Sequence, residues 1–473
     1  MENAKKKKGI RMPHNYVIVF CIILLAMLLT YVVPAGAYER GTDPNTGRTV
    51  VIDGSFHYNE QTPVGPFELF ECIAQGFNEV SDIIFFIIFA YAWVNVLLTN
   101  GTFDSMMGAI IRKFGDKVEY LIPVLMISFG ILGSTMGMSE ETYGLLPVFV
   151  GIAIALGYDA IVGGAMVYVG VATGFASATL NPFTIGVAMG ISGVEYPYGL
   201  GLRIVILCAF EAVAIWYVMR YARKVHKDPT KSILYGTPLE IKQTKSREEL
   251  VATQVTGRHI ACGIAFLVTV FFIVFGTIKW GWYINELSAL FIVSMIVTAI
   301  VGGGMGPNEI AKNFVNAGRD MIFGAMIVGL ARGIVVVLTN GGVIDTIIYG
   351  LSQPLTHMSN ILGAASEYIC AVGMLVVQNI INCFIGSGSG QASAVMPIMA
   401  PLSDLIGVSR QTAILAFQFG DGYSNMFWPS GVFLISGLMN IPANKWWRFV
   451  APLFGIMFCL QVVFVCIAVA IGF

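Results

Sequence analysis

Long apolar runs separated by short polar connections dominate the pattern of the chain. A helix that crosses a membrane needs about 20 apolar residues, and several of the runs have that length. The pattern therefore predicts an all-α polytopic membrane protein with about 11 spans. The apolar runs lie near residues 15–36, 80–98, 119–156, 160–192, 200–220, 259–277, 286–303, 321–339, 361–406, 411–441 and 449–471.

The composition points to the same class. Of the 473 residues, 56% are hydrophobic and 12% are charged. An average soluble domain has about 25% charged residues, so this chain is better suited to facing lipid than water. The net charge of −1 favours neither a nucleic acid nor an acidic polymer as partner. We therefore expect a lipid membrane and a small-molecule substrate as the partners, and no nucleic acid.

Positive charges predict the orientation, because cytoplasmic loops are enriched in Lys and Arg. Lys5 to Lys8 and Arg11 predict a cytoplasmic N-terminus. The loop from Arg220 to Arg258 has nine Lys or Arg against four acidic residues, which also predicts the cytoplasm. Segment 37–65 has two Arg and four acidic residues, which suits the outside, where we also expect Phe473. The predicted location is the inner (cytoplasmic) membrane of a bacterial cell.

Two apolar runs, 119–156 and 361–406, are too long for a single helix. Arg112, Lys113 and Lys117 place the residues before run 119–156 inside. An even number of crossings then requires this run to enter and leave on the same side, as a re-entrant hairpin. Its turn is predicted at Gly133–Thr142, called tip one below. Run 361–406 predicts the matching hairpin from outside, with its turn at Gly386–Gln391, called tip two.

The two halves of the chain resemble each other. Leu98-Thr99-Asn100-Gly101 followed by Asp104 matches Leu338-Thr339-Asn340-Gly341 followed by Asp345. A predicted hairpin follows each match, and the charges place the two matches on opposite sides. A repeat in opposite orientation predicts inverted-topology repeats, a recurrent transporter design. The predicted parts are a first helix and outer loop (1–65), repeat one (66–220, with hairpin 119–156), a cytoplasmic loop (221–258), scaffold helices (259–306) and repeat two (307–473, with hairpin 361–406).

Runs 160–192 and 411–441 predict broken helices. Each would be about 45 Å long as a straight helix, whereas the hydrocarbon core is about 30 Å thick. Gly174–Phe183, called break one, and Phe419–Gly431, called break two, interrupt them with glycine, proline and polar residues. Asn181 before Pro182 suits a helix N-cap. Unwound backbone at membrane depth is tolerated only where it lines a site, so the tips and breaks predict one.

The chemistry of such a site follows from its groups. Helix N-termini suit a carboxylate, and unwound carbonyls with side-chain oxygens suit a hard cation such as sodium. Acidic side chains at this depth are functional candidates, able to bind a substrate cation or carry a coupling proton. The predicted cation site comprises Ser134, Thr135, Ser139 and Gly174. The predicted substrate-binding residues are Ser139, Glu140, Glu141, Thr142, Asn181, Ser387, Ser389, Gln391, Asp421, Ser424 and Asn425.

Structural explanations compete with these assignments. Small hydroxyl residues also pack transmembrane helices, and Glu140 and Glu141 suit the first turn of a helix. Glu211 and Arg332 also fall within predicted spans, where they could pair in a structural role. The eight Cys and five His lack zinc-type spacing, and no Walker-type loop or nucleophile–base set is visible. We expect no enzyme and no cofactor besides a coupling sodium ion or proton.

Several segments resemble a known transporter family. They are Pro34-Ala35-Gly36-Ala37-Tyr38-Glu39-Arg40, the Gly386–Gln391 tip, and Gly420-Asp421-Gly422-Tyr423-Ser424-Asn425. Nearly the whole chain resembles the YfcC branch of the C4-dicarboxylate anaerobic carrier family. The resemblance implies the ion transporter superfamily, with paired re-entrant hairpins, broken helices, a homodimer and an elevator motion of the hairpin-bearing domain against a scaffold.

The resemblance leaves two substrate classes open. Dicarboxylate symporters of that superfamily carry Ser-Asn-Thr at both tips, whereas Ser139-Glu140-Glu141-Thr142 and Gly388-Ser389-Gly390-Gln391 stand here. The YfcC branch is associated with basic amino acids, including arginine–ornithine exchange, and the acidic site residues agree with such a substrate. The expected function is therefore secondary active transport of a small, basic amino acid, as a symporter or antiporter. An ion-coupled C4-dicarboxylate transporter is the alternative, and a channel is the rival class.

Overall fold

The computed structural model describes residues 14–44, 47, 49–114, 119–238, 247–359 and 366–473, and most of them are helical. Within these residues, seven helices are long and apolar enough to cross a membrane. This confirms the predicted all-α membrane class, while the total number of spans stays a prediction. The seven helices are α1 (Asn15–Val32), α3 (Ser81–Thr99), α10 (Leu200–Lys227), α12 (Gly257–Phe275), α13 (Ile284–Gly303), α14 (Pro307–Asn340) and α20 (Ala443–Ala470).

Runs 119–156 and 361–406 each form a helix, a turn and a second helix. The first comprises α5 (Leu121–Met136), the short 3-10 helix η2 (Glu140–Leu145) and α6 (Leu146–Ala155). The second comprises α16 (Ser366–Asn382) and α17 (Gly388–Leu405), and the first residues of run 361–406 lie outside the described residues. The turns fall at tip one and tip two, as predicted. How deep either hairpin enters the membrane stays a prediction.

Both long runs are interrupted within or directly after the predicted breaks, but later than predicted, because Gly174–Ala176 and Phe419–Ser424 are still helical. Helix α7 (Ala160–Gly164), the π-helix η3 (Ala165–Val169) and α8 (Gly170–Ala176) follow one another, and α9 (Ile185–Ile191) begins only after break one. In the second run α18 (Arg410–Ser424) gives way to α19 (Pro429–Leu438). Pro429 is the first residue of α19, where its missing N–H has no cost.

Several elements were not predicted, because they are short or only partly apolar. In the described part of the chain four short strands follow α1, with β1 antiparallel to β4 and β2 antiparallel to β3. These additional elements are β1 (Gly36–Ala37), β2 (Arg40–Thr42), β3 (Thr49–Val51), β4 (His57–Tyr58), α2 (Glu68–Glu79), α4 (Thr102–Phe114), η4 (Pro229–Lys231), α11 (Arg247–Ala252), η5 (Gly276–Trp280) and α15 (Ile344–Ser359).

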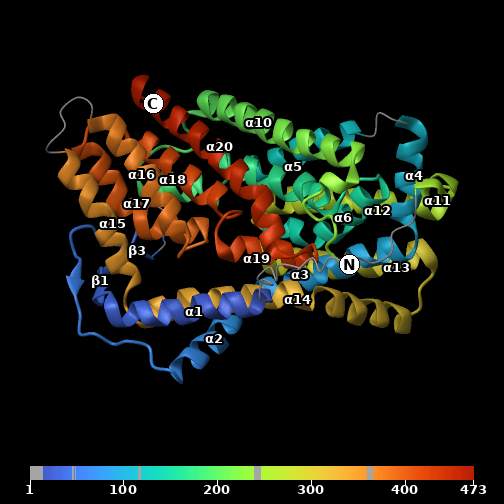
Figure 1. Ribbon diagram of the computed structural model, residues 1–473, viewed down its shortest axis with the longest axis horizontal. Helices are drawn as coiled ribbons and strands as arrows, with labels where there is room; N and C mark the ends of the chain where they lie inside the picture. Colours follow the sequence, from blue (N-terminus) through green and yellow to red (C-terminus); the bar gives the residue numbers. More distant parts are fainter. Residues whose placement is uncertain (1–13, 45–46, 48, 115–118, 239–246, 360–365) are drawn as a thin grey trace, which may run out of the picture.

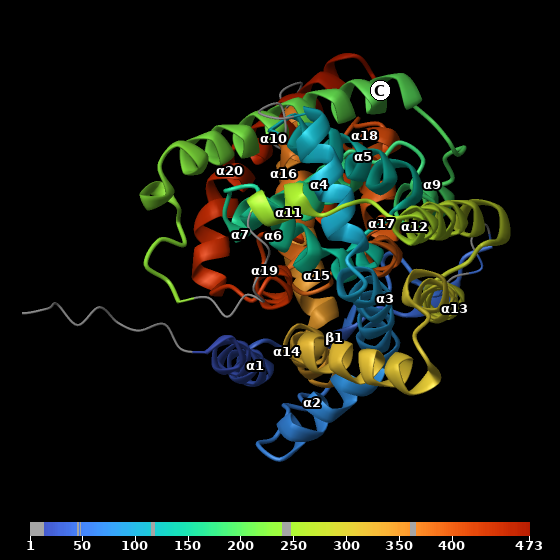
Figure 2. The same ribbon diagram turned by 90° about the vertical axis from the view of Figure 1, so that its right-hand side faces the viewer.

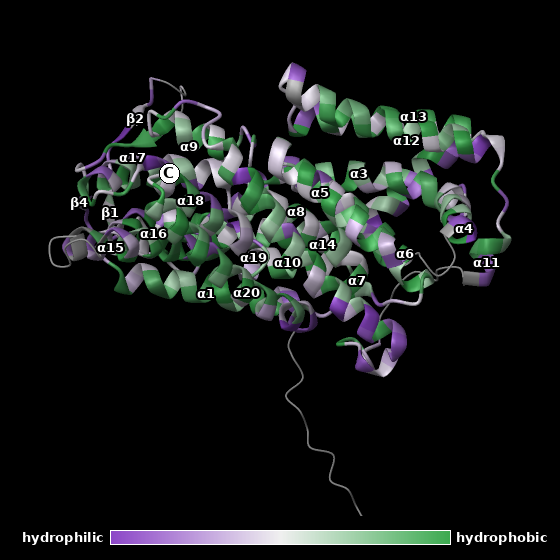
Figure 3. Cartoon of the chain, turned by 90° about the horizontal axis from the view of Figure 1, so that it is seen from above, coloured by the Kyte–Doolittle hydropathy of each residue, from purple (hydrophilic) through white to green (hydrophobic). Residues whose placement is uncertain are grey.

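The element order repeats as the sequence predicted. Each half contains a long helix, a shorter helix, a hairpin, a broken helix and a final long helix. The named helices of this series are α3, α4 and α10 in the first half and α14, α15 and α20 in the second. Asp104 and Asp345 occupy the first turns of α4 and α15. Figures 1 and 3 show α4 and α15 at opposite ends of the molecule, which is the arrangement of inverted repeats.

The helices pack in two groups. One, called the long-helix bundle, comprises α1, α2, α3, α12, α13 and α14, and the other, called the hairpin bundle, comprises α5 to α10 and α16 to α20. Figure 2 shows the long-helix bundle along one side of the hairpin bundle. The bundles meet where η2 packs on α3 and where α19 packs on α14. The hairpins and both breaks therefore belong to one packed unit.

Exposed apolar side chains cover the outer helices, as expected for contact with lipid. On α12, Ile264, Leu267 and Phe271 are each more than half exposed. In Figure 3, which colours hydrophobic residues green, much of α12 and α13 is green. Such a surface would be unstable in water, which agrees with the membrane class.

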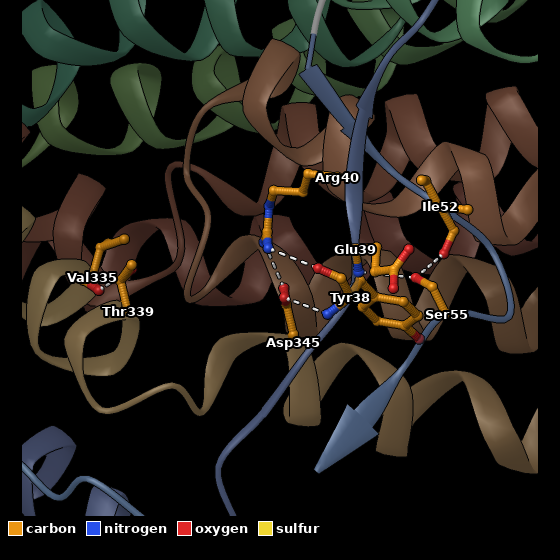
Figure 4. Close-up of polar contacts among 8 residues, drawn as sticks. All are labelled: Tyr38, Glu39, Arg40, Ile52, Ser55, Val335, Thr339 and Asp345. Carbon is orange, nitrogen blue, oxygen red and sulfur yellow. Dashed lines mark hydrogen bonds and ion pairs between the residues drawn. The ribbon is translucent and has the colours of Figure 1, made fainter. Parts of the chain in front are cut away.

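Asp345 fixes the stranded segment to the start of α15. Its Oδ2 accepts a hydrogen bond from the Tyr38 amide at 3.0 Å, and its Oδ1 pairs with Arg40 Nη2 at 2.9 Å (Figure 4). Arg40 Nη1 also donates to the Tyr38 carbonyl. The buried carboxylate thus satisfies backbone and side-chain donors of the loop, and orders it against the start of α15.

The described residues of segments 37–65 and 221–258, which the distribution of charges assigns to opposite sides of the membrane, lie toward opposite ends of the molecule. Figures 1 and 3 show the strands and the C-terminus at one end, and α4 and α11 at the other. Ser409 donates a hydrogen bond to the Phe473 carbonyl at the first of these ends. The placement agrees with segments 37–65 and 221–258 lying on opposite sides. Which side is cytoplasmic stays a prediction, since Lys5 to Lys8, Arg11 and Lys117 lie outside the described residues.

Candidate functional site

Tip one is bonded to break one through Ser134. The Ser134 hydroxyl donates to the Ser177 carbonyl at 3.1 Å and lies 3.0 Å from Thr179 Oγ1. The Ser134 carbonyl accepts from the backbone amides of Thr179 and Leu180. All these side chains except Leu180 are buried. The end of α5 and the unwound backbone of break one therefore form one rigid junction lined with oxygen atoms.

Other polar groups of tip one bond within the tip. Glu141 Oε2 accepts from the Ser139 amide at 2.9 Å, and the Thr142 hydroxyl donates to the Ser139 carbonyl. Glu140 and Glu141 occupy the first turn of η2, as the structural explanation anticipated. Thr135 donates to the Ile131 carbonyl of its own helix. The structure therefore does not bring the Thr135 hydroxyl to the Ser134 junction.

Asn382 joins tip two to break two in the same manner. Its Nδ2 donates to Asp421 Oδ1 at 3.0 Å, and its Oδ1 accepts from the Ser424 hydroxyl at 2.7 Å. It also bonds Gln391, whose amide group donates to Gln378. In each half, a polar residue in the last turn of the helix before the tip is thus bonded to the following break: Ser134 in the first half and Asn382 in the second.

Gly388, at the start of α17, packs between Thr184 of the first half of the chain and Asp421 of the second half. A Cβ atom built there would lie 2.5 Å from Thr184 Cγ2 and 2.7 Å from Asp421 Oδ2. No side chain larger than hydrogen fits without displacing one of them. Tip two therefore contacts Thr184, which follows break one, and Asp421, which lies in break two, at the same glycine.

Asn181 brings tip one to the same region. Its Oδ1 accepts from the amides of Phe183 and Thr184. The predicted role as helix N-cap is wrong, because α9 begins only at Ile185 with Thr184 in the N-cap position, and Asn181 instead closes the turn before it. Gly137 of tip one packs against it, because a Cβ at Gly137 would lie 2.4 Å from Asn181 Oδ1. Gly137 also has a φ of +70°, a conformation suited to glycine.

Unsatisfied polar atoms gather at this meeting point. Asp421 Oδ2, Thr184 Oγ1 and Asn181 Nδ2 are buried and have no hydrogen-bond partner among the described residues. Buried polar atoms are normally paired, so such a group needs an explanation. Glu140 also lies within electrostatic range of Asp421. The Asp421 oxygen can therefore accept a hydrogen bond from a polar ligand, and the Thr184 hydroxyl and the Asn181 amide can donate to it.

The two broken helices cross beside this site. Gly422 lies against Ala176, where a Cβ would approach Ala176 Cα to 2.4 Å. Gln418 Nε2 donates to the Phe175 carbonyl at 2.6 Å. The crossing fixes Asp421 relative to break one.

The predicted residues differ in where the structure places them. Asn181, Asp421 and Ser424 lie at the meeting point, and Asn425 neighbours Asp421. Ser387 caps α17 by accepting from the Gly390 amide, Ser389 accepts from Ser393 through its carbonyl, and Gln391 bonds within tip two. Gly174 packs under the Gly130 carbonyl, which a Cβ would approach to 1.8 Å.

Sequence reasoning missed Asn382, Thr184 and Gln378. An available signal was the series Gln378, Asn379 and Asn382 in an otherwise apolar helix. The suggested pairing of Glu211 with Arg332 is wrong. Arg332 pairs with Glu79 of α2 at 2.7 Å, and Glu211 lies in the hairpin bundle without a hydrogen-bond partner among the described residues.

Paired hairpins, broken helices and a buried polar site define a membrane protein of the transporter class. The chain matches the family "C4-dicarboxylate anaerobic carrier" (DcuC) over residues 12–470, and it belongs to that family. It is 30% identical to the Escherichia coli (strain K12) protein named "Putative basic amino acid antiporter YfcC", over 99% of each chain. It is also 26% identical to an uncharacterized protein of Haemophilus influenzae, over 100% of this chain and 99% of the other.

Two solved structures are more distantly similar. The Alcanivorax borkumensis YdaH transporter aligns with 14% identity and a TM-score of 0.43, over 98% of this chain and 99% of the other. Neisseria gonorrhoeae MtrF, an antimetabolite efflux pump, aligns with 15% identity and a TM-score of 0.43, over 98% and 96%. A likeness at this level carries no inference about substrate or mechanism.

Proposed function

We propose that this protein is a secondary active transporter of a small basic amino acid of the arginine or ornithine type, working as a symporter or antiporter. The observation that supports it most is the pairing of opposite chemistries at Gly388. Asp421 offers an unpaired carboxylate oxygen there, while Thr184 and Asn181 offer unpaired groups that can donate. An amino acid carries a cation and a carboxylate, and so needs both.

The carboxylate of the substrate is assigned to the N-terminus of α17. The first amides of a helix have no acceptor within it and favour an anion. Gly388 is the first residue of α17, and it packs directly against Thr184 and Asp421. Thr184 and Asn181 add a hydroxyl and an amide beside it, whereas the corresponding turn of tip one already holds Glu140 and Glu141.

The cationic end of the substrate is assigned to Asp421. Its Oδ1 is held by Asn382, which leaves Oδ2 for an ammonium or guanidinium group. Glu140 adds negative potential to the same region. A dicarboxylate would instead meet two carboxylates there, so the alternative substrate is disfavoured by like charge.

Transport is proposed to follow an elevator-like alternating-access mechanism. The hairpins and broken helices pack as one unit, and its described contacts with the long-helix bundle include η2 on α3 and α19 on α14. Sliding along this interface would carry the intact site across the membrane. The long-helix bundle is assigned as the scaffold and the site of homodimer contact, in a bacterial inner membrane with the N-terminus in the cytoplasm.

A coupling ion is proposed at the Ser134 junction. Ser134 Oγ, Thr179 Oγ1 and the Ser177 carbonyl converge there, and oxygen ligands of this kind suit sodium. The set predicted from the sequence comprises Ser134, Thr135, Ser139 and Gly174, of which Thr135 bonds its own helix instead. A proton carried by Glu140 or Asp421 is the alternative coupling.

Counterflow in proteoliposomes tests the substrate class. Vesicles containing the purified protein are loaded with unlabelled arginine, ornithine or succinate, and uptake of each labelled compound is followed with and without sodium. We expect labelled arginine to accumulate only in vesicles loaded with arginine or ornithine. Accumulation of succinate against a succinate load, with no response to the amino acids, would establish the dicarboxylate alternative. Flux that neither saturates nor shows counterflow would indicate a channel.

A further inference from the structure

Glu211 is a buried acid outside the proposed substrate site. It lies on α10 with 7% of its surface exposed, and neither carboxylate oxygen has a hydrogen-bond partner in the part of the chain that the structure describes. It projects onto Gly130 of α5, where a Cβ atom would lie 1.8 Å from Glu211 Oε1. The absence of a side chain at Gly130 therefore leaves the space that the carboxyl group occupies.

Tyr423, in break two, lies near Glu211 and also near Thr173 of α8. Its hydroxyl is fully buried and lacks a hydrogen-bond partner among the described residues, and it lies within electrostatic range of Glu211. Phe210 and Phe419 pack with their ring centroids 5.1 Å apart, which holds α10 against α18 at this level. A carboxyl group and a phenol are thus enclosed together between α5, α8, α10 and α18.

No cation balances Glu211 in this enclosure within the described residues. Helices α5 and α8 contain no titratable side chain, and Tyr168 lies on η3, which also packs on α10. On α18, Tyr423 lies near Glu211, whereas Asp421 bonds Asn382 and Arg410 pairs with Asp404. Arg203, eight residues earlier on α10 and so about 12 Å along the helix axis, donates to the Tyr198 and Ala178 carbonyls. Tyr217 of α10 donates to the Phe449 carbonyl of α20. On α20, Lys445 and Arg448 lie in the first turns, and Cys459 and Cys466 are the remaining titratable groups.

We propose that Glu211 is a proton-binding site that couples transport to a proton gradient, with Tyr423 as its hydrogen-bonding partner. An unpaired carboxylate in a low-dielectric interior is costly, whereas a neutral carboxylic acid with a phenol beside it is not. Releasing the proton therefore requires water or a new partner, which a movement of the hairpin bundle can supply. The role in coupling rests on the proposed transport function.

The position of Glu211 relates it to both breaks. Gly130 lies one turn before Ser134, whose hydroxyl holds break one. Tyr423 stands next to Ser424 and two residues after Asp421. A negative charge formed at Glu211 would destabilise the packing of α10 against α5 and α18. It would thereby affect the bond of Ser134 to break one and the bond of Ser424 to Asn382.

Infrared difference spectroscopy tests the proton site without any substrate. Spectra of the purified protein are recorded across a pH series for wild type, Glu211→Gln, Tyr423→Phe and the exposed control Glu60→Gln. We expect a pH-dependent carboxylic acid C=O band that is absent in Glu211→Gln, shifted in Tyr423→Phe and unchanged in Glu60→Gln. Gln has the shape of the neutral acid, and Tyr423→Phe gives a second reading if Glu211→Gln unfolds. A Glu211→Gln spectrum that superimposes on wild type would overturn the proposal.

Transport separates this proposal from the proposed function. Arginine uptake driven by a pH gradient is expected to fall to the level of empty liposomes in Glu211→Gln and to persist in Glu60→Gln. If wild type shows no arginine counterflow, the substrate assignment fails while the infrared result still decides the role of Glu211. If wild type transports arginine and Glu211→Gln keeps the same response to the pH gradient, the coupling role fails alone.

Discussion

The side-chain amide of Asn382 donates a hydrogen bond to the carboxylate of Asp421, with 3.0 Å between Nδ2 and Oδ1. The same Asn382 accepts from Ser424 through its Oδ1, so its amide plane is fixed from both sides. One oxygen of Asp421 is thereby held in place, and the other has no partner among the described residues. This arrangement orients a buried carboxylate toward a ligand.

Removing the Asn382 amide should disturb both stability and binding. Asn382→Ala removes the donor to Asp421 Oδ1, at a cost of about 1–3 kcal/mol for an unsatisfied buried group. It also removes one bond each from Ser424 and Gln391, which keep their bonds to the Gly420 carbonyl and to Gln378. We expect a lower unfolding temperature in detergent and weaker arginine binding. The exposed Asn59→Ala serves as the matched control. Wild-type stability and affinity in Asn382→Ala would show that this bond does not organise the site.

Two glycines of tip two should respond differently to the same substitution. Gly388→Ala places a methyl group within 2.7 Å of both Thr184 and Asp421, whereas the nearest atom at Gly386 is 3.7 Å away. We therefore expect Gly388→Ala to abolish arginine counterflow and Gly386→Ala to preserve it. Equal activity of the two variants would mean that tip two does not close on Asp421 during transport.

Sodium coupling at the Ser134 junction predicts a specific loss. Ser134→Ala removes the hydroxyl that faces Ser177 and Thr179, so the sodium concentration giving half-maximal uptake should rise. Ser128→Ala, whose hydroxyl bonds its own helix at Val124, should behave as wild type. Wild-type uptake that ignores sodium and depends on pH would remove the sodium site and leave proton coupling.

The predicted orientation is tested by labelling single cysteines with an impermeant maleimide in whole cells. The eight native cysteines are first replaced, and a cysteine is introduced at Glu60 or Tyr235, both exposed. The Glu60 position should be labelled from outside and the Tyr235 position only after permeabilisation. Labelling of both from the same side would contradict the topology inferred from the distribution of Lys and Arg.

The sequence was sufficient for features that depend on hydrophobic length and on helix-breaking residues. The interruption of run 411–441 and the start of α19 at Pro429 follow from proline chemistry alone. Asn181 before Pro182 bonds the backbone of the turn that follows, but α9 begins three residues later than Pro182, at Ile185. The turns at tip one and tip two likewise follow from glycine and small polar residues within apolar runs.

Other features depend on contacts between distant segments. Asn382 looks like one more polar residue in a helix until α16 packs beside α18 and brings it to Asp421. Gly388 is one of several glycines in tip two, and only its approach to Thr184 singles it out. Strands β1 to β4 are too short for a periodic signal. Arg332 could be matched with Glu79 only once α2 is placed against α14.

The role of Asp421 is the central claim, and the affinity for arginine tests it most directly. Asp421→Asn keeps the shape of the side chain and an oxygen for Asn382 while removing the charge. A hydrogen bond to a charged group is worth about 1.5–3 kcal/mol, so arginine binding should weaken by about ten- to a hundredfold. Isothermal titration of wild type, Asp421→Asn and the exposed control Asp53→Asn with arginine and with succinate gives the answer. The account predicts weakened arginine binding in Asp421→Asn alone, and it is contradicted if that variant binds arginine as tightly as wild type or if wild type binds only succinate.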